Sequence, residues 1–136
     1  MSAERRYLDS SALVKLVVDE TQSRALEAHL SRGPSEASCG LAHVEVIRAV
    51  RPAGQRAVTY ARTLLSDIDI LTVDGALLDA AADLPDERLR SLDAVHVAAA
   101  LSLGDDLAEL ITYDRAMAAA AEGFGLRVSS PSDPLA

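Results

Sequence analysis

The chain has 136 residues, of which 49% are hydrophobic and only 3% aromatic, so it can build the aliphatic core of one domain of ordinary size. No apolar run approaches the roughly 18 residues of a membrane span, the first residues lack the apolar stretch of a secretory signal, and the single cysteine, Cys39, has no internal disulfide partner. We therefore expect a cytoplasmic protein with no membrane partner, and the net charge of −8 argues at first against a nucleic-acid partner as well.

Helical and strand-like segments alternate along the sequence. In chain order we expect a strand at 5–9, helices at 12–18 and 21–33, a strand at 35–39, helices at 41–50 and 54–67, a strand at 68–73, helices at 74–84 and 91–104, a strand at 109–113, a helix at 114–125 and a strand at 126–130. Ser10 or Ser11 is the expected cap of the first helix, and Ser91 that of the helix at 91–104. This alternation predicts an α/β domain with a mostly parallel sheet of about four to five strands, covered by helices on both faces.

Four acidic residues lie in or beside apolar segments, where an unpaired charge is costly. Asp9 and Asp114 each follow a predicted strand, and Asp93 lies at the start of a predicted helix. Glu45 lies within the helix at 41–50, and its longer side chain can reach a site from further back. Because ligands bind beyond the carboxyl ends of parallel strands, all four acids can converge at one end of the sheet.

Clustered carboxylates repel one another unless a cation holds them together. Their oxygens suit a hard divalent ion such as Mg²⁺, with Mn²⁺ as a substitute, and one or two such ions can activate water for attack on a phosphodiester. Bound ions would also offset the acidity, because the chain has 13 basic and 17 acidic residues once these four are set aside. The four acids therefore predict metal-dependent hydrolysis of a nucleic acid.

The acids lie in four segments, which are YLDSSALVKL, LAHVEVIRA, LRSLDAVHVAAAL and LITYDRAMAAAAEGFGL. In this order and at these separations, the segments resemble the PIN-domain ribonucleases of the VapC toxin family, from bacterial toxin–antitoxin pairs. The resemblance covers about residues 6–130, so we expect a single PIN-like domain over 1–136 with a loose tail at 131–136. It implies a three-layer α/β/α fold, Mg²⁺- or Mn²⁺-dependent endoribonuclease activity, homodimerisation and inhibition by a small cognate antitoxin.

The resemblance assigns each acid a catalytic, metal-binding role. Asp9 matches the acid that closes the first strand, and Glu45 matches the glutamate of the V-E-x-x-R-A segment. Asp93 matches the acid of L-D-A-x-H, and Asp114 matches the acid of T-Y-D. Ser11 matches a small hydroxyl residue often found two positions after the first acid, and is a candidate accessory residue. Some relatives carry a further acid beside the last one. It is absent here, so a second metal position would lack that ligand.

Each acid also has an ordinary structural interpretation. Asp93 and Asp114 can cap helices, Asp9 can belong to a turn, and Glu45 can pair with an arginine on its own helix. Ser11 is either a cap or part of the site. Two other functional classes stay open: a binding module that kept the fold and lost activity, and a metal-dependent phosphatase. The phosphatase would need a second acid where this chain has Ser11.

Arginines and apolar helical segments provide the candidate surfaces for substrate and partners. The arginines that flank the acids in sequence are candidate phosphate contacts: Arg48, Arg51, Arg90 and Arg115. Cleavage needs an exposed backbone, so we expect single-stranded RNA. His96, three residues after Asp93, is expected to pack or hydrogen-bond near the site rather than bind metal. The apolar helical segments at 12–18 and 21–30 exceed what the sheet can cover, which predicts a homodimer and an antitoxin-binding surface.

Overall fold

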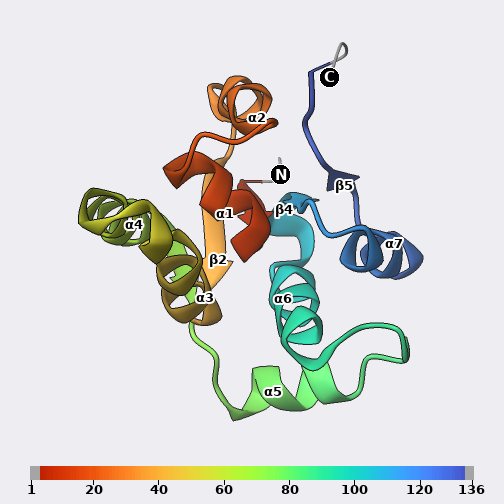
Figure 1. The fold of residues 1–136 in the computed structure, drawn as a ribbon. Helices are drawn as coiled ribbons and strands as arrows, with labels where there is room; N and C mark the ends of the chain where they lie inside the picture. Colours follow the sequence, from red (N-terminus) through yellow and green to blue (C-terminus); the bar gives the residue numbers. More distant parts are fainter. Residues whose placement is uncertain (1–3, 134–136) are drawn as a thin grey trace.

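A five-stranded sheet lies at the centre of the computed structural model, which describes residues 4–133 (Figure 1). The strands are β1 (Arg5–Leu8), β2 (Ser35–Cys39), β3 (Asp69–Leu71), β4 (Leu107–Ile111) and β5 (Val128–Ser129). They lie in the order β3-β2-β1-β4-β5, and every neighbouring pair is parallel. The predicted parallel sheet is confirmed, and helices return the chain between its strands as parallel pairing requires.

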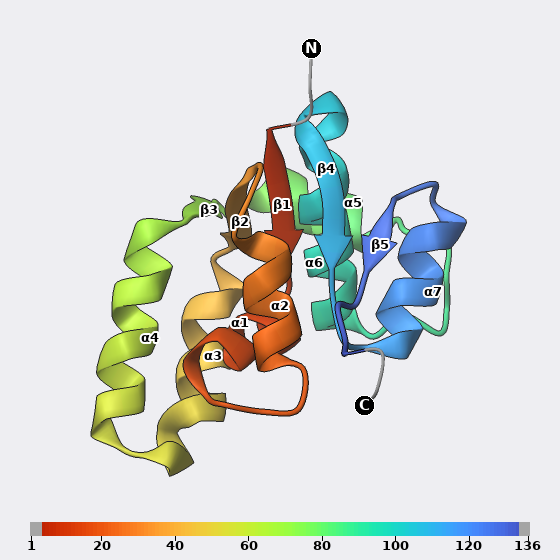
Figure 2. The same ribbon diagram turned by 90° about the horizontal axis from the view of Figure 1, so that it is seen from above.

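Helices cover both faces of this sheet. They are α1 (Ser10–Val17), α2 (Ser23–Leu30), α3 (Leu41–Val50), α4 (Gln55–Asp67), α5 (Gly75–Ala82), α6 (Ser91–Ser102) and α7 (Arg115–Gly123), with 3₁₀ turns η1 (Arg51–Ala53) and η2 (Gly104–Asp106). Helices α1 to α4 pack on one face and α5 to α7 on the other (Figures 1 and 2). The expected three-layer α/β/α architecture is therefore present.

The alternation of side chains along β1 divides the core into two halves. Tyr7 and Leu8 are consecutive and fully buried, but their side chains point to opposite faces of the sheet. Leu8 joins the apolar residues of α1, α3 and α4, whereas Tyr7 joins those of α5, α6 and α7. Helix α6 is buried without interruption over residues 94–100, so the residues that begin this helix are firmly anchored.

The order of strands reverses between β1 and β4. From β1 the chain adds β2 and β3 toward one edge of the sheet, whereas β4 and β5 extend toward the other edge. In open α/β sheets, the crevice beyond the carboxyl ends of the strands at such a reversal is the usual ligand site. Figure 2 shows β1 and β4 side by side, with both arrowheads pointing in the same direction. Asp9 and Asp114 follow these two strands.

Two predicted helix caps are wrong. Asp9, rather than Ser10 or Ser11, precedes α1 as its cap and accepts a hydrogen bond from a main-chain N–H of the first turn. Ser91 is the first residue of α6, and Arg90 precedes that helix without a side-chain cap. Asp9 takes the cap position because it directly follows the last paired residue of β1, where the backbone is still extended.

Strand boundaries differ slightly from prediction. Strand β4 begins two residues earlier than expected, because Leu107 pairs with Arg5 in the ladder to β1. Strand β3 has three residues and is shorter than expected. Of the predicted tail at 131–136, residues 131–133 form no helix or strand, and residues 134–136 lie outside the described part. Among residues 4–133, no helix is long and apolar enough to span a membrane.

Candidate active site

Asp9 is held by three hydrogen bonds in the turn between β1 and α1. Its Oδ1 accepts from the Ser11 hydroxyl at 2.7 Å and the Ala12 N–H at 3.0 Å, and its Oδ2 accepts from the Thr112 hydroxyl at 2.6 Å. Only 2% of the residue is exposed. Burial raises the pKa of Asp9 and outweighs the hydrogen bonds, which lower it. The hydrogen bonds therefore offset only part of the cost of burying the charged form of Asp9.

The hydroxyls of Ser11 and Thr112 connect the turn after β1 with the turn after β4. While it donates to Asp9, Ser11 Oγ accepts the N–H of Tyr113 at 3.0 Å. Thr112 Oγ1 likewise donates to Asp9 and accepts the N–H of Asp114 at 3.0 Å. Each hydroxyl thus donates its one proton to the Asp9 carboxylate and accepts an N–H from the turn after β4. These contacts fix the separation of the two strand ends that carry acids.

Asp114 combines a structural role with a place beside a groove. Its Oδ1 accepts the N–H of Met117 at 3.0 Å and caps α7, as its ordinary interpretation predicts. Within residues 4–133, no hydrogen bond to its other oxygen is found. The groove beside it has a volume of about 330 Å³ and is lined by Gln22, Tyr113, Asp114, Arg115, Ala118, Ser130 and Ser132. One carboxylate oxygen of Asp114 is therefore available to a ligand.

Glu45 reaches the acid cluster from α3 and is held through one oxygen. Its Oε1 accepts hydrogen bonds from the Ser10 hydroxyl and from Nε2 of His96, each at 2.7 Å. Burial raises the pKa of Glu45, but the hydrogen bonds from His96 and Ser10 outweigh burial and bring the pKa below its usual value. Burial lowers the pKa of His96, but its contacts with Cys39 and Glu45 prevail and raise it to about 10.

Asp93 lies half-buried in the first turn of α6, and the charges of the other three acids act on its carboxylate. Burial raises its pKa and the charge of Asp114 raises it further; His96 lowers it, and Asp9 and Glu45 add smaller contributions that raise it. No hydrogen bond or ion pair to its carboxylate is found among the described residues. Of the predicted ligands, Asp93 is therefore the one with the least compensation.

The four acids come from four separate parts of the fold, and positive charge is scarce around them. In the described part of the chain, the only ion pair that any of them forms is that between Glu45 and His96. Within the same residues, no group of three or more His, Cys, Asp and Glu side chains is already arranged to hold a metal ion. Carboxylate oxygens that repel one another nevertheless fit a hard divalent cation such as Mg²⁺ or Mn²⁺. The site is an open acid cluster that such an ion can draw together.

The four arginines predicted to contact phosphate are all exposed, and none forms an ion pair within residues 4–133. Arg48 lies one turn after the site glutamate on α3, Arg90 directly precedes α6, and Arg115 begins α7. Arg51 lies in η1, beyond the end of α3. The first three therefore stay next to elements that carry an acid, whereas Arg51 is set further away along the chain.

Three polar groups of the site were not predicted as site residues from the sequence. Tyr7, Ser10 and Thr112 all hydrogen-bond to site residues or their partners, yet their assignment needs contacts between distant elements. The signal in the sequence is proximity, because each lies within two residues of a predicted site acid. The expected hydrogen bond of His96 near the site is confirmed.

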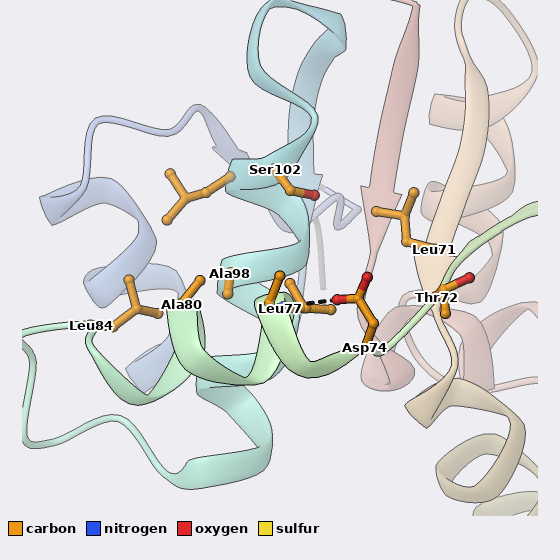
Figure 3. A pocket seen from close by; sticks show the side chains of 10 residues that line it. Leu71, Thr72, Asp74, Leu77, Ala80, Leu84, Ala98 and Ser102 are labelled. Carbon is orange, nitrogen blue, oxygen red and sulfur yellow. Dashed lines mark hydrogen bonds between the residues drawn. The ribbon is translucent and has the colours of Figure 1, made fainter.

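A separate cavity of about 550 Å³ lies between β3, α5 and α6 (Figure 3). Its lining is mostly aliphatic, and Asp74 at its edge uses one oxygen to cap α5 by accepting the N–H of Leu77 at 2.9 Å. None of the four acids lines this cavity. A mostly aliphatic hollow with Asp74 as its one acidic residue lacks the several carboxylates that metal-dependent phosphodiester chemistry needs, so the acid cluster is the better candidate.

Comparison with known proteins agrees with this geometry. The family model of the PIN domain matches residues 6–123. Ribonuclease VapC46 of Mycobacterium tuberculosis (strain ATCC 25618 / H37Rv) is 45% identical over 126 residues, which cover 93% of this chain and 97% of that protein. Ribonuclease VapC47 of M. tuberculosis (strain CDC 1551 / Oshkosh) is 35% identical over 130 residues, which cover 92% and 96%.

A solved toxin–antitoxin complex from Klebsiella pneumoniae contains a chain of the same fold. The TM-score is 0.72 at 22% sequence identity, with 94% of this chain and 98% of that chain covered. PIN-domain ribonucleases generally depend on a divalent metal ion, which agrees with the carboxylate-rich site. On these grounds, the chain belongs to the PIN-domain family and, within it, to the VapC ribonucleases, which are nuclease hydrolases.

Proposed function

We propose that this chain is an Mg²⁺- or Mn²⁺-dependent endoribonuclease and the toxin of a toxin–antitoxin pair, with Asp9, Glu45, Asp93 and Asp114 as the residues that hold the ion. One observation carries the proposal. Burial and the charge of Asp114 raise the pKa of Asp93, and within residues 4–133 its carboxylate has no hydrogen bond and no ion pair. Acids that converge without compensation lose much of their mutual repulsion when a cation binds between them.

The side chains are prepared for this task in different ways. Ser11 and Thr112 fix both oxygens of Asp9, so this ligand cannot rotate freely. Asp93 keeps its carboxylate free of hydrogen bonds among the described residues, which leaves it open to direct ligation. When bound, a divalent ion supplies an activated water and offsets the charge that develops on the leaving oxygen. No side chain needs to act as a covalent nucleophile, and we expect products with a 5′-phosphate and a 3′-hydroxyl.

RNA is proposed to lie single-stranded over the exposed arginines next to the acids. Arg115 supports this path best, because it lines the groove of about 330 Å³ that also contains Asp114. Gln22 and Ser130 on the walls of the same groove provide side-chain hydrogen-bonding groups for a nucleotide. The net charge of −8 makes such local placement of arginine necessary, because the protein as a whole repels RNA.

The proposed partners are a small cognate antitoxin and a second copy of the chain. We place the protein in the cytoplasm and assign residues 1–136 to one domain. The solved Klebsiella structure is a toxin–antitoxin complex, which supports a partner of that kind. Large apolar side chains that stay exposed also favour partner contacts: Val44, Tyr60, Leu78 and Leu92. The apolar residues of α1 give weaker support than expected, because most of them pack partly into the core.

Cleavage of a mixed pool of structured RNAs in Mn²⁺ tests the enzymatic proposal. We expect the wild-type chain to produce discrete fragments in Mn²⁺ and none in excess EDTA. End-labelling should show a 5′-phosphate at the new ends. Arg115→Gln should weaken cleavage mainly through RNA affinity, which a substrate titration would show as a raised KM.

The rival interpretation is a binding module that kept the fold and lost activity. It predicts RNA or protein binding without fragments at any Mn²⁺ concentration, and that result would contradict the enzymatic proposal. Sedimentation at tens of micromolar tests the homodimer separately, and a purely monomeric profile would contradict that part alone.

A further inference from the structure

His96 is buried in α6 directly behind Glu45, with only 1% of the residue exposed. Its Nε2 lies 2.7 Å from Oε1 of Glu45, and its Nδ1 lies 2.8 Å from the hydroxyl of Tyr7. The Tyr7 ring is fully buried and stands edge-on to the imidazole, with 5.9 Å between the ring centres and 70° between their planes. The imidazole is therefore fixed at both nitrogens.

The position of one proton on His96 follows from its partners. An ionised carboxylate only accepts hydrogen bonds, so Nε2 must donate to Glu45. In the neutral imidazole, Nδ1 then accepts from the Tyr7 hydroxyl, whereas in the imidazolium Nδ1 donates and the tyrosine oxygen accepts. Nε2–H is directed at Glu45 in both forms. The contact therefore does not depend on the protonation state of His96.

Both donors to Glu45 meet the same oxygen. Ser10 donates to Oε1 at 2.7 Å, as His96 does, and no hydrogen bond to Oε2 is found among the described residues. The side chain of Glu45 is 27% exposed, so its outer end is accessible. Two donors on one oxygen restrict the rotation of this long side chain and leave the second oxygen available.

We propose that His96 is a positioning residue of the active site, which, supported by Tyr7, holds Oε1 of Glu45 so that Oε2 stays available to the divalent ion. The inference rests on the proposed function, because it gives Glu45 the task of holding that ion. A buried histidine can also serve packing alone, and its loss would then lower stability without changing metal affinity. Metal affinity is therefore the quantity that separates the two roles.

The test measures Mn²⁺ binding to the full chain from the electron paramagnetic resonance signal of free Mn²⁺. His96→Leu keeps apolar bulk without a donor, whereas His96→Gln carries an amide N–H at about the position of Nε2. We expect His96→Leu to weaken Mn²⁺ affinity about 10–100-fold, as loss of a hydrogen-bond partner behind a metal ligand does. His96→Gln should recover most of that loss, and cleavage at saturating Mn²⁺ should change less than affinity does.

A double-mutant cycle tests whether His96 acts through Glu45. If it does, adding His96→Leu to Glu45→Ala should change Mn²⁺ affinity further by less than about threefold, because Glu45→Ala already removes the side chain through which His96 acts. Losses that add fully would overturn the proposal, and so would unchanged affinity in His96→Leu. A His96→Gln variant no better than His96→Leu would also count against it.

Two further variants separate positioning from packing. Val97→Ala, at the next and fully buried position of α6, should lower the melting temperature but keep wild-type Mn²⁺ affinity. Tyr7→Phe removes only the hydroxyl behind His96 and should weaken Mn²⁺ affinity in the same direction by a smaller factor; it carries the test if His96→Leu fails to fold. If the wild-type protein bound no Mn²⁺, the proposed function would be contradicted. If the wild type bound Mn²⁺ and the His96 and Tyr7 variants bound it with the same affinity, only the positioning role would be overturned.

Discussion

The carboxylates of Glu109 and Asp93 have opposite surroundings within one small protein. Glu109 lies in β4 and is 7% exposed. Its Oε2 lies 3.0 Å from Nε of Arg6 and 2.6 Å from Nε2 of His29, and the Ser129 hydroxyl donates to Oε1. Burial raises the pKa of Glu109, but hydrogen bonds from Ser129 and His29 and the charges of His29 and Arg6 bring it below its usual value.

Asp93 shows the reverse balance. Burial raises its pKa, and the charges of Asp114, Asp9 and Glu45 add to that rise. An acid whose charge is compensated from within the chain stabilises the fold, whereas acids left uncompensated need a cation from outside. Burial alone therefore does not mark a metal site, because both kinds of acid are withdrawn from water. The pKa values of Glu109 and Asp93 shift in opposite directions, whereas Glu45, which His96 compensates, shares the direction of Glu109.

Asp93→Asn should disrupt the acid cluster with the largest effect. We expect cleavage in Mn²⁺ to fall by about 10³-fold, which corresponds to several kcal/mol of lost transition-state stabilisation. The variant should melt no lower than wild type in EDTA, because one repelling charge is gone. Saturating Mg²⁺ at about a hundred times its Kd should stabilise wild type by about 2.7 kcal/mol and the variant by less.

Thermal melts with and without Mg²⁺, together with initial cleavage rates, check this prediction. Asp79→Asn, on an exposed position of α5, is the matched control for removal of one negative charge. It should leave both quantities unchanged. Full activity of Asp93→Asn at saturating metal would contradict the assignment of the site.

Glu109→Gln should break the compensated cluster and affect stability instead of catalysis. Arg6 and His29 would lose their buried anionic partner, and we expect the free energy of unfolding to fall by about 3 kcal/mol. Urea denaturation measures this loss, and Mn²⁺ affinity should stay at the wild-type value. Glu20→Gln, which removes the exposed partner of Lys15, should cost less than about 1 kcal/mol. Equal losses in both variants would mean that the network around Glu109 contributes no more than a surface pair.

Glu45→Gln should sharpen the ranking within the acid cluster. Its amide oxygen can still accept from Ser10 and His96, so the side chain keeps its place while it loses its charge. We expect the half-saturating Mg²⁺ concentration to rise by about tenfold, as for other weakened metal contacts, with the rate plateau largely retained. Mg²⁺ titrations of the initial rate against Asp93→Asn check this. A lost plateau in Glu45→Gln and a retained one in Asp93→Asn would reverse the ranking.

The contribution of Glu109 should also depend on pH. Its folded pKa lies below the ordinary value of 4.5, so its stabilisation is fully present above that value and is lost as pH falls through the folded pKa. The difference in unfolding free energy between wild type and Glu109→Gln should therefore shrink as pH falls below about 4.5. Urea midpoints of both proteins at several pH values measure it. A difference that persists in strong acid would contradict ionic pairing with Arg6.

Much of the fold and the candidate site could be predicted from local patterns. Helical and strand periods are set by neighbouring residues, so the strands and helices lie close to their expected ranges. Asp9 and Asp114 stand out because an acid directly after an apolar strand is visible without any tertiary information. Caps were less predictable, since Asp9 and Ser10 are adjacent residues that both can cap a helix.

The sequence by itself determined the order of elements, the parallel sheet and the acids at its carboxyl end, because these depend on local periodicity and chain direction. Only the tertiary structure decided which acids are compensated. The register of β1 with β4 sets Arg6 opposite Glu109, and Tyr7 meets His96 across 89 positions of sequence. A hydrogen bond or ion pair forms only within a few ångströms. The charge balance around a buried acid is therefore fixed by contacts between elements that no local pattern records.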